Sequence, residues 1–113
     1  MLKESDIRKR FIKEIKNKVK DEIYFSNPSG LAFQGITKGD KLIIKRKIAF
    51  GLQEGSSDFI GIKKIKITEE DIGKEYGLFI ALEIKSPTGR MRKNQKEFKK
   101  LIEEYGGKYI LYK

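Results

Sequence analysis

Apolar residues recur at helical spacing in two segments of this chain. Near its start they stand three or four positions apart with lysine and arginine between them, which predicts an opening helix that Ser5 or Asp6 caps. A similar apolar stripe runs from Met91 to Tyr105, and Gly106-Gly107 ends it, which predicts a second helix. The apolar positions of the opening helix are Ile7, Phe11, Ile12, Ile15 and Val19.

Short apolar runs between these helices predict strands. The runs over residues 41–50, 59–62 and 78–85 are bounded by glycine, serine and aspartate, and a last one follows at 109–112. Turns are expected at residues 26–30 and 38–40, and Thr68 with Asp71 matches a capping box that predicts a short helical turn. The order helix, strands, helix, strand predicts an α/β protein, and 113 residues predict one domain over 1–113.

The strand over residues 78–85 ends in charge. Because alternate side chains share a face, Glu83 and Lys85 project together beside Phe79 and Ala81. The opposite face is apolar as well, so the early strand is expected to be central and covered on both sides. One interpretation of the charged end is an exposed ion pair of little energetic consequence.

A second carboxylate, Asp58, stands at the start of the other short apolar strand, after the flexible Gly55-Ser56-Ser57. If the two strands are neighbours, Asp58 and Glu83 converge, and a bound divalent cation would favour both ionised forms. Oxygen ligands of this kind, completed by water and the Ile84 carbonyl, suit Mg²⁺ or Mn²⁺. Lys85 would then activate the attacking water or stabilise charge at a phosphate, which is metal-dependent phosphodiester hydrolysis.

The amino-acid composition excludes several other kinds of catalytic and metal site. The chain has no cysteine and no histidine, so thiolate catalysis, Cys-based zinc sites and imidazole acid–base catalysis are excluded. Its formal charge of +10 favours a polyanionic partner, although a lysine-rich surface can serve solubility alone. Because no apolar run is long enough to span a bilayer and the first residues carry charge, we expect no membrane partner and a cytoplasmic location.

Asp58 followed by Glu83-Ile84-Lys85 resembles the PD-(D/E)xK nuclease signature, and the surrounding residues are more specific. The segments Gly51-Leu52, residues 55–62, residues 79–85, Thr88-Gly89-Arg90, Gln95 and Gly106-Gly107 are similar to those of the VRR-Nuc family, the virus-type replication-repair nucleases. The resemblance runs from about Glu4 to the end of the chain and is greatest to the small standalone members of phages.

The resemblance implies a restriction-endonuclease-like core, a central mixed β-sheet flanked by helices, and metal-dependent DNA cleavage. It further implies a homodimer that resolves branched DNA such as Holliday junctions, in the cytoplasm of a bacterial host. By position, Asp58 and Glu83 would be metal ligands, Lys85 the catalytic lysine, and Gln95 a residue facing the site. A further acidic residue of the first helix corresponds to Glu4, with Asp6 and Glu14 as rivals.

The basic residues most clustered outside this centre are the candidates for contacts to DNA phosphates. They are expected to bind without base specificity and with strong salt dependence. The chain departs from the family pattern at Arg92, Asn94 and Phe25, which bears on DNA contacts more than on the metal site. The candidates are Lys45, Arg46, Lys47, Arg90, Arg92 and Lys93.

Three classes of function are compatible with these residues. A structure-selective endonuclease accounts for the two carboxylates, Lys85 and the basic charge together. A non-catalytic nucleic-acid-binding module accounts for the charge but leaves carboxylates near DNA unexplained. A small structural or assembly protein, in which Glu83 and Lys85 form a surface ion pair, predicts no DNA affinity.

Overall fold

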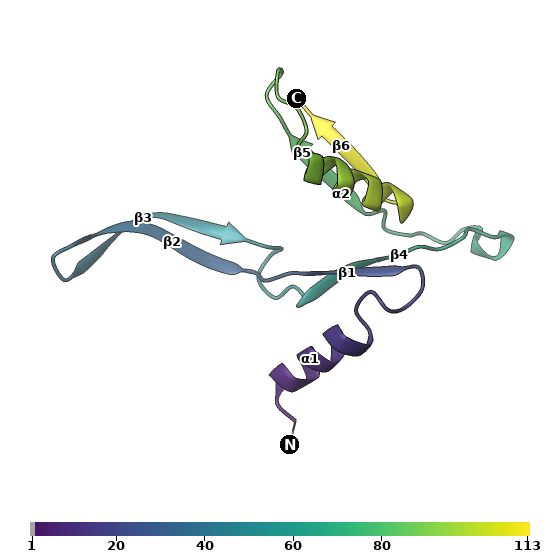
Figure 1. Ribbon diagram of the computed structural model, residues 1–113, viewed down its shortest axis with the longest axis horizontal. Coiled ribbons are helices and arrows are strands. Elements are labelled where there is room, and N and C mark those ends of the chain that lie inside the picture. Colours follow the sequence, from purple (N-terminus) through teal and green to yellow (C-terminus); the bar gives the residue numbers. More distant parts are fainter. Residues whose placement is uncertain (1) are drawn as a thin grey trace. The chain divides into compact units, whose positions relative to one another are not determined.

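The computed structural model describes residues 2–113 and confirms the α/β class, with helices and strands mixed along the chain (Figure 1). The first half holds α1 (Glu4–Glu14), β1 (Glu22–Ser26), β2 (Gly30–Lys38) and β3 (Lys41–Phe50). The second half holds β4 (Phe59–Lys63), the 3-10 helix η1 (Glu69–Asp71), β5 (Ile80–Ile84), α2 (Lys93–Glu104) and β6 (Lys108–Tyr112). The predicted strand at 41–50 matches β3, and the three other predicted strands match β4, β5 and β6 within a few residues.

The strands of the described residues pair in three two-stranded sheets, β1 with β4, β2 with β3 and β5 with β6. The resemblance implies one central mixed sheet, and the observed pairing differs from it. Strands β4 and β3 pair with β1 and β2, which the sequence pattern did not predict. In the part of the chain that is described, β4 and β5 are therefore not hydrogen-bonded neighbours.

The chain divides into two compact units. One unit contains the residues up to Ile23 together with Ile62–Lys113, and the other is Tyr24–Gly61. The boundary crosses β1 and β4 within their lengths. The prediction of a single domain over residues 1–113 stays a prediction.

Strands β2 and β3 form an antiparallel ribbon whose tight turn pairs Lys38 with Lys41 (Figure 1). The register shifts at Gln34/Gly35, which leaves Lys45 as an extra residue in β3 and creates a β-bulge. Glycine is required at this bulge, because a Cβ on Gly35 would lie 2.2 Å from the Ile43 carbonyl oxygen. The ribbon is therefore specified by its turn and by this bulge as much as by its apolar residues.

Strands β5 and β6 run parallel, and α2 connects them. The ladder extends beyond β5 at both ends, because the Lys108 N–H donates to the Phe79 carbonyl and the Lys85 N–H donates to the Tyr112 carbonyl, each at 2.9 Å. Ile102 of α2 is fully buried, and Gly107 leaves room for it, since a Cβ there would lie 2.7 Å from Ile102 Cγ2. This packing fixes α2 against the sheet that carries Glu83.

The expectation that β5 is covered on both faces is wrong. Ile80, Leu82 and Ile84, which share one face, are exposed, whereas the alternate residues from Phe79 to Lys85 are half-buried. Within the described residues β5 has one hydrogen-bonded neighbour, β6. The apolar residues of β5 thus form one half-buried face and one face that is exposed to solvent.

The opening helix is shorter than the apolar spacing predicts. It ends at Glu14, and Val19 lies in the turns that follow, where Asn17 takes the left-handed conformation with a φ of 60°. The predicted caps Ser5 and Asp6 lie inside α1. Lys3 is the N-cap, and the Asp6 carboxylate at the third helical position accepts a hydrogen bond from the Lys3 N–H at 3.3 Å.

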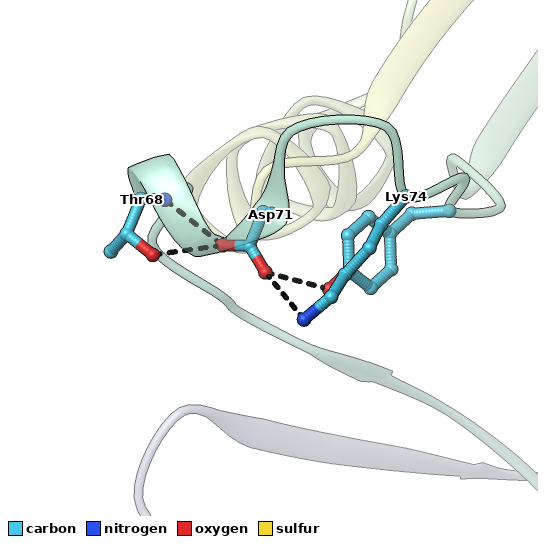
Figure 2. Close-up of polar contacts among 4 residues, drawn as sticks. Thr68, Asp71 and Lys74 are labelled. Atoms are coloured by element: carbon cyan, nitrogen blue, oxygen red, sulfur yellow. Dashed lines mark hydrogen bonds and ion pairs between the residues drawn. The ribbon is translucent and has the colours of Figure 1, made fainter.

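The predicted capping box at Thr68 is confirmed. The Asp71 carboxylate accepts a hydrogen bond from the Thr68 N–H at 2.9 Å and lies between Thr68 and Lys74, whose ammonium is 3.4 Å away (Figure 2). The Tyr76 hydroxyl donates to the same carboxylate at 3.1 Å. The backbone bond from Thr68, followed by the bond from Tyr76, holds the pKa of Asp71 below its ordinary value.

We expect the segment around Asp71 to lose stability in acid. Because the folded pKa of Asp71 is lowered, its stabilising contribution is complete above the unfolded pKa and is lost as the pH falls through the folded pKa. Thermal melting of Asp71→Asn and wild type should therefore differ at neutral pH, with the wild type more stable, and should converge in acid. A difference that stays constant over this range would contradict the role of the carboxylate.

Candidate functional site

Glu83 and Lys85 lie on the sheltered face of β5, where α2 covers the sheet. Both side chains project to this face because they are two residues apart in an extended strand. The Lys85 Nζ lies 3.6 Å from Glu83 Oε1, and the two side chains are 15% and 30% exposed. The pair is thus more sheltered than the surface ion pair considered from the sequence, and solvent still reaches its carboxylate.

Gln95 joins this pair from the first turn of α2. Its Nε2 donates a hydrogen bond to Glu83 Oε1 at 3.0 Å, and its Oε1 accepts one from the Arg92 N–H at 2.9 Å. Gln95 therefore closes the capping box of α2 and contacts the strand carboxylate at the same time. Periodicity alone describes Gln95 as a polar residue at a helix start, and the structure adds a contact with Glu83.

The charge of Glu83 contributes to a shift in the pKa of Tyr109 in β6. It pairs with Ala81 in the parallel ladder, so it belongs to the neighbouring strand of the same sheet. Desolvation raises the pKa of Tyr109, the negative charge of Glu83 raises it further, and Lys99 opposes the shift. The phenol accordingly stays protonated around neutral pH.

The Ile84 carbonyl belongs to the edge of β5 that faces away from β6. Peptide groups alternate between the two edges of a strand, and those of Phe79 and Lys85 bond to β6. The intervening even-numbered groups, including Ile84, are therefore directed to the opposite edge. Two oxygen donors, the Glu83 carboxylate and the Ile84 carbonyl, thus come from adjacent residues of one strand.

This donor set fits a hard divalent cation. Carboxylate and backbone carbonyl oxygens are ligands that Mg²⁺ and Mn²⁺ prefer, and no nitrogen or sulfur ligand competes with them in this cluster. Among the described residues no group of three or more acidic side chains is placed to hold a metal ion. The oxygens of Glu83 and Ile84 would therefore be only part of a ligand set.

Asp58 and Glu83 belong to different units of the chain. Asp58 is exposed at a bend before β4, and its carbonyl oxygen accepts a hydrogen bond from the Asn27 N–H at 2.8 Å. In the described part of the chain, β4 pairs with β1 and β5 pairs with β6. The convergence of Asp58 and Glu83 stays a prediction.

The three acidic candidates of the N-terminal helix all lie on α1. Glu4 is its first residue, Asp6 bonds to the Lys3 N–H, and Glu14 is its last residue. All three are exposed. The bond to Lys3 gives Asp6 a capping role, which leaves Glu4 and Glu14 as the better candidates for a role outside the helix.

The basic candidates fall into two groups of exposed side chains. The first surrounds the β-bulge of β3 in the ribbon. The second follows Glu83 in the chain: Arg90 is in the loop after β5, Arg92 caps α2, and Lys93 is its first residue. The first group consists of Lys45, Arg46 and Lys47.

Asn27 is a residue that the sequence pattern did not single out. It lies among the turn formers of residues 26–30, where a single asparagine is unremarkable, yet the structure buries it to 7% exposure. No sequence pattern distinguishes a buried asparagine from one in an exposed turn, so the sequence does not identify Asn27 as a functional residue. Its contacts are with the loop that leads to Asp58.

Comparison with known proteins identifies no relative of this chain, since no family model, curated protein or solved structure matches it. Across residues 2–113, no helix has the length and apolar character needed to cross a membrane.

Proposed function

We propose that this protein is a divalent-metal-dependent DNA endonuclease of the VRR-Nuc type, which hydrolyses phosphodiester bonds in branched DNA. The observation that carries the proposal is the contact of Gln95 with Glu83, at 3.0 Å, beside the Lys85 ammonium. The resemblance assigns these three residues to one catalytic centre, and they come from a strand and the helix that follows it. A surface ion pair requires no such third partner.

In this mechanism Glu83 and the Ile84 carbonyl would hold the metal, and the resemblance implies Asp58 as a further carboxylate ligand. When bound, Mg²⁺ or Mn²⁺ supplies charge neutralisation at the phosphate and lowers the pKa of a coordinated water. Lys85 orients the attacking water or stabilises the negative charge that develops on the phosphate oxygens. Gln95 fixes the rotamer of the Glu83 carboxylate by donating to one of its oxygens.

The basic side chains would bind the DNA backbone. Arg90 and Arg92 are exposed and follow the catalytic strand closely in sequence, so they are candidates for a phosphate near the scissile bond. The ribbon residues Lys45, Arg46 and Lys47 would contact other phosphates, and Lys93 follows Arg92 at the start of α2. Binding of this kind is strongly salt-dependent and carries no base specificity.

The test is cleavage of labelled four-way junction, flap, single-stranded and duplex DNA with Mg²⁺ or Mn²⁺. We expect wild type to cut branched DNA, EDTA to stop the reaction, and Glu83→Gln to bind DNA without cutting it. Glu97→Gln, an exposed position of α2, is the matched control. Binding to every substrate with no cleavage in either metal would instead support a non-catalytic nucleic-acid-binding module, and absence of binding would support the structural or assembly role.

Replacing Gln95 tests its link to Glu83. Gln95→Glu keeps an oxygen that can accept the Arg92 N–H, so α2 should remain capped, but it puts a second carboxylate against Glu83. We expect cleavage to fall by about 10- to 100-fold while the helix content measured by circular dichroism is unchanged. Wild-type cleavage by this variant would show that the contact has no part in the reaction.

Symmetric cutting of a four-way junction requires two related sites, so we propose that the protein acts as a homodimer. Its place of action would be the cytoplasm of a bacterium that carries the phage. Light scattering and analytical ultracentrifugation on free protein and on the junction complex test the dimer. A monomer in both states would contradict it, whereas cleavage of single-strand substrates would remain compatible with a monomer.

A further inference from the structure

We infer that Asn27 is a positioning residue for Asp58, and that it acts by clamping the loop of residues 51–57 against the end of β1. The inference rests on the proposed function, because it assigns Asp58 to the metal. All residues of the clamp lie within the unit Tyr24–Gly61.

The Asn27 side chain makes three hydrogen bonds with this loop. Its Nδ2 donates one hydrogen bond to Ser56 Oγ at 2.9 Å and another to the Ser57 carbonyl at 2.8 Å, and its Oδ1 accepts one from the Leu52 N–H at 3.1 Å. Both ends of the loop are therefore tied to one side chain. Because Asn27 is buried, a replacement that cannot make these bonds leaves polar groups without partners.

The backbone of Asn27 is also hydrogen-bonded to Asp58 itself. Its N–H donates to the Asp58 carbonyl at 2.8 Å, one residue beyond β1 and one residue before β4. The Ser57 hydroxyl donates to the Phe59 carbonyl at 2.8 Å on the other side of Asp58. The main chain of Asp58 is thus held on both sides, while its side chain is exposed.

The loop has a backbone that needs such a clamp. Gly51 and Gly55 both adopt positive φ angles, of 72° and 86°, and glycine gives up the most conformational freedom on folding. Without the amide of Asn27, the loop between these glycines would sample other conformations and carry Asp58 with it. A metal ligand that must first be ordered binds more weakly, because the ordering cost is subtracted from the binding free energy.

Metal binding without DNA is the first readout. The affinity for Mn²⁺ is measured by electron paramagnetic resonance of free Mn²⁺ on wild type, Asn27→Ala, Asn27→Asp and Asp58→Asn. We expect both Asn27 variants to bind Mn²⁺ about 10- to 100-fold more weakly, in the same direction as Asp58→Asn. Gln53→Glu makes the same amide-to-carboxylate change at an exposed side chain of this loop and should keep wild-type affinity.

The second readout separates positioning from folding. In cleavage against Mn²⁺ concentration, the Asn27 variants should need more Mn²⁺ for half-maximal rate and regain the wild-type rate at saturation, with unchanged junction affinity in Ca²⁺. A merely structural role would lower the rate at every Mn²⁺ concentration together with the folded circular dichroism signal, and that result would overturn the inference. If Asn27→Ala does not fold, Ser56→Ala, which removes one acceptor from the clamp, should show a smaller shift in the same direction.

Folded Asn27 and Ser56 variants with wild-type Mn²⁺ affinity would overturn the inference and leave the proposed nuclease untouched. A wild type that binds Mn²⁺ but cuts no DNA would contradict the proposed nuclease, while the comparison of Mn²⁺ affinities would still decide the role of Asn27. A wild type that binds no Mn²⁺ would overturn both.

Discussion

Glu83→Ala is expected to reduce metal-dependent DNA cleavage by at least about 100-fold, because it removes a ligand of the metal. Lys85→Ala is expected to reduce it by about 100- to 1,000-fold, as does loss of a single group that stabilises transition-state charge in other enzymes. The two side chains lie 3.6 Å apart, so their effects should be strongly non-additive in the double variant. The measurement is the single-turnover rate on labelled four-way junction with saturating Mn²⁺.

Matched replacements on α2 provide the controls for this prediction. Glu97→Ala and Lys100→Ala remove the same charges from exposed positions and should cut at the wild-type rate. All four variants should bind junction DNA in Ca²⁺ with affinities near wild type, since the change in net charge is a single unit. Equal cleavage by Glu83→Ala and Glu97→Ala would remove the basis of the proposed active site.

Gly51→Ala is expected to destabilise the unit Tyr24–Gly61 by about 2–5 kcal/mol, the largest stability effect that we predict. A Cβ at Gly51 would lie 2.3 Å from the Pro28 carbonyl oxygen and 2.8 Å from Ser29 Cα, both of them backbone atoms. The residue also has a φ of 72°, which costs a residue with a side chain about 1–2 kcal/mol before any clash. Overpacking adds about 1–3 kcal/mol. Urea denaturation with hydrogen exchange of the β2 and β3 amides measures the loss.

Gly55→Ala is the control that separates the two costs. Gly55 has a φ of 86° in the same loop, but no atom lies within 4 Å of the position of its Cβ. It should therefore show the backbone cost of about 1–2 kcal/mol without the steric one. Equal destabilisation by the two substitutions would mean that the loop moves away from Pro28 and Ser29 at no cost.

The elements with the clearest periodicity were predictable from the sequence. The strand β3, the capping box at Thr68 and the helix that ends before Gly106-Gly107 depend on local rules, namely turn residues, short-range hydrogen bonds and apolar spacing. Strand β1 was not predictable in this way because its pairing partner, β4, is distant in sequence. Strand β2 is followed directly by its partner β3, but it contains Gly30 and Gly35, which weaken a strand pattern. The apolar spacing predicts an opening helix that is too long, because the spacing continues past Asn17, where the backbone adopts the left-handed conformation.

By itself the sequence determined the residue types available for chemistry, the placement of Glu83 and Lys85 on one strand face, and the strong positive charge. These follow from covalent order and the two-residue repeat of a strand. Only the tertiary structure decided that Gln95 donates a hydrogen bond to Glu83 and that Asn27 holds the loop before Asp58, because a bond between side chains of two elements depends on how those elements pack. It also decided that β5 has an open apolar face, since coverage depends on which elements pack together rather than on composition.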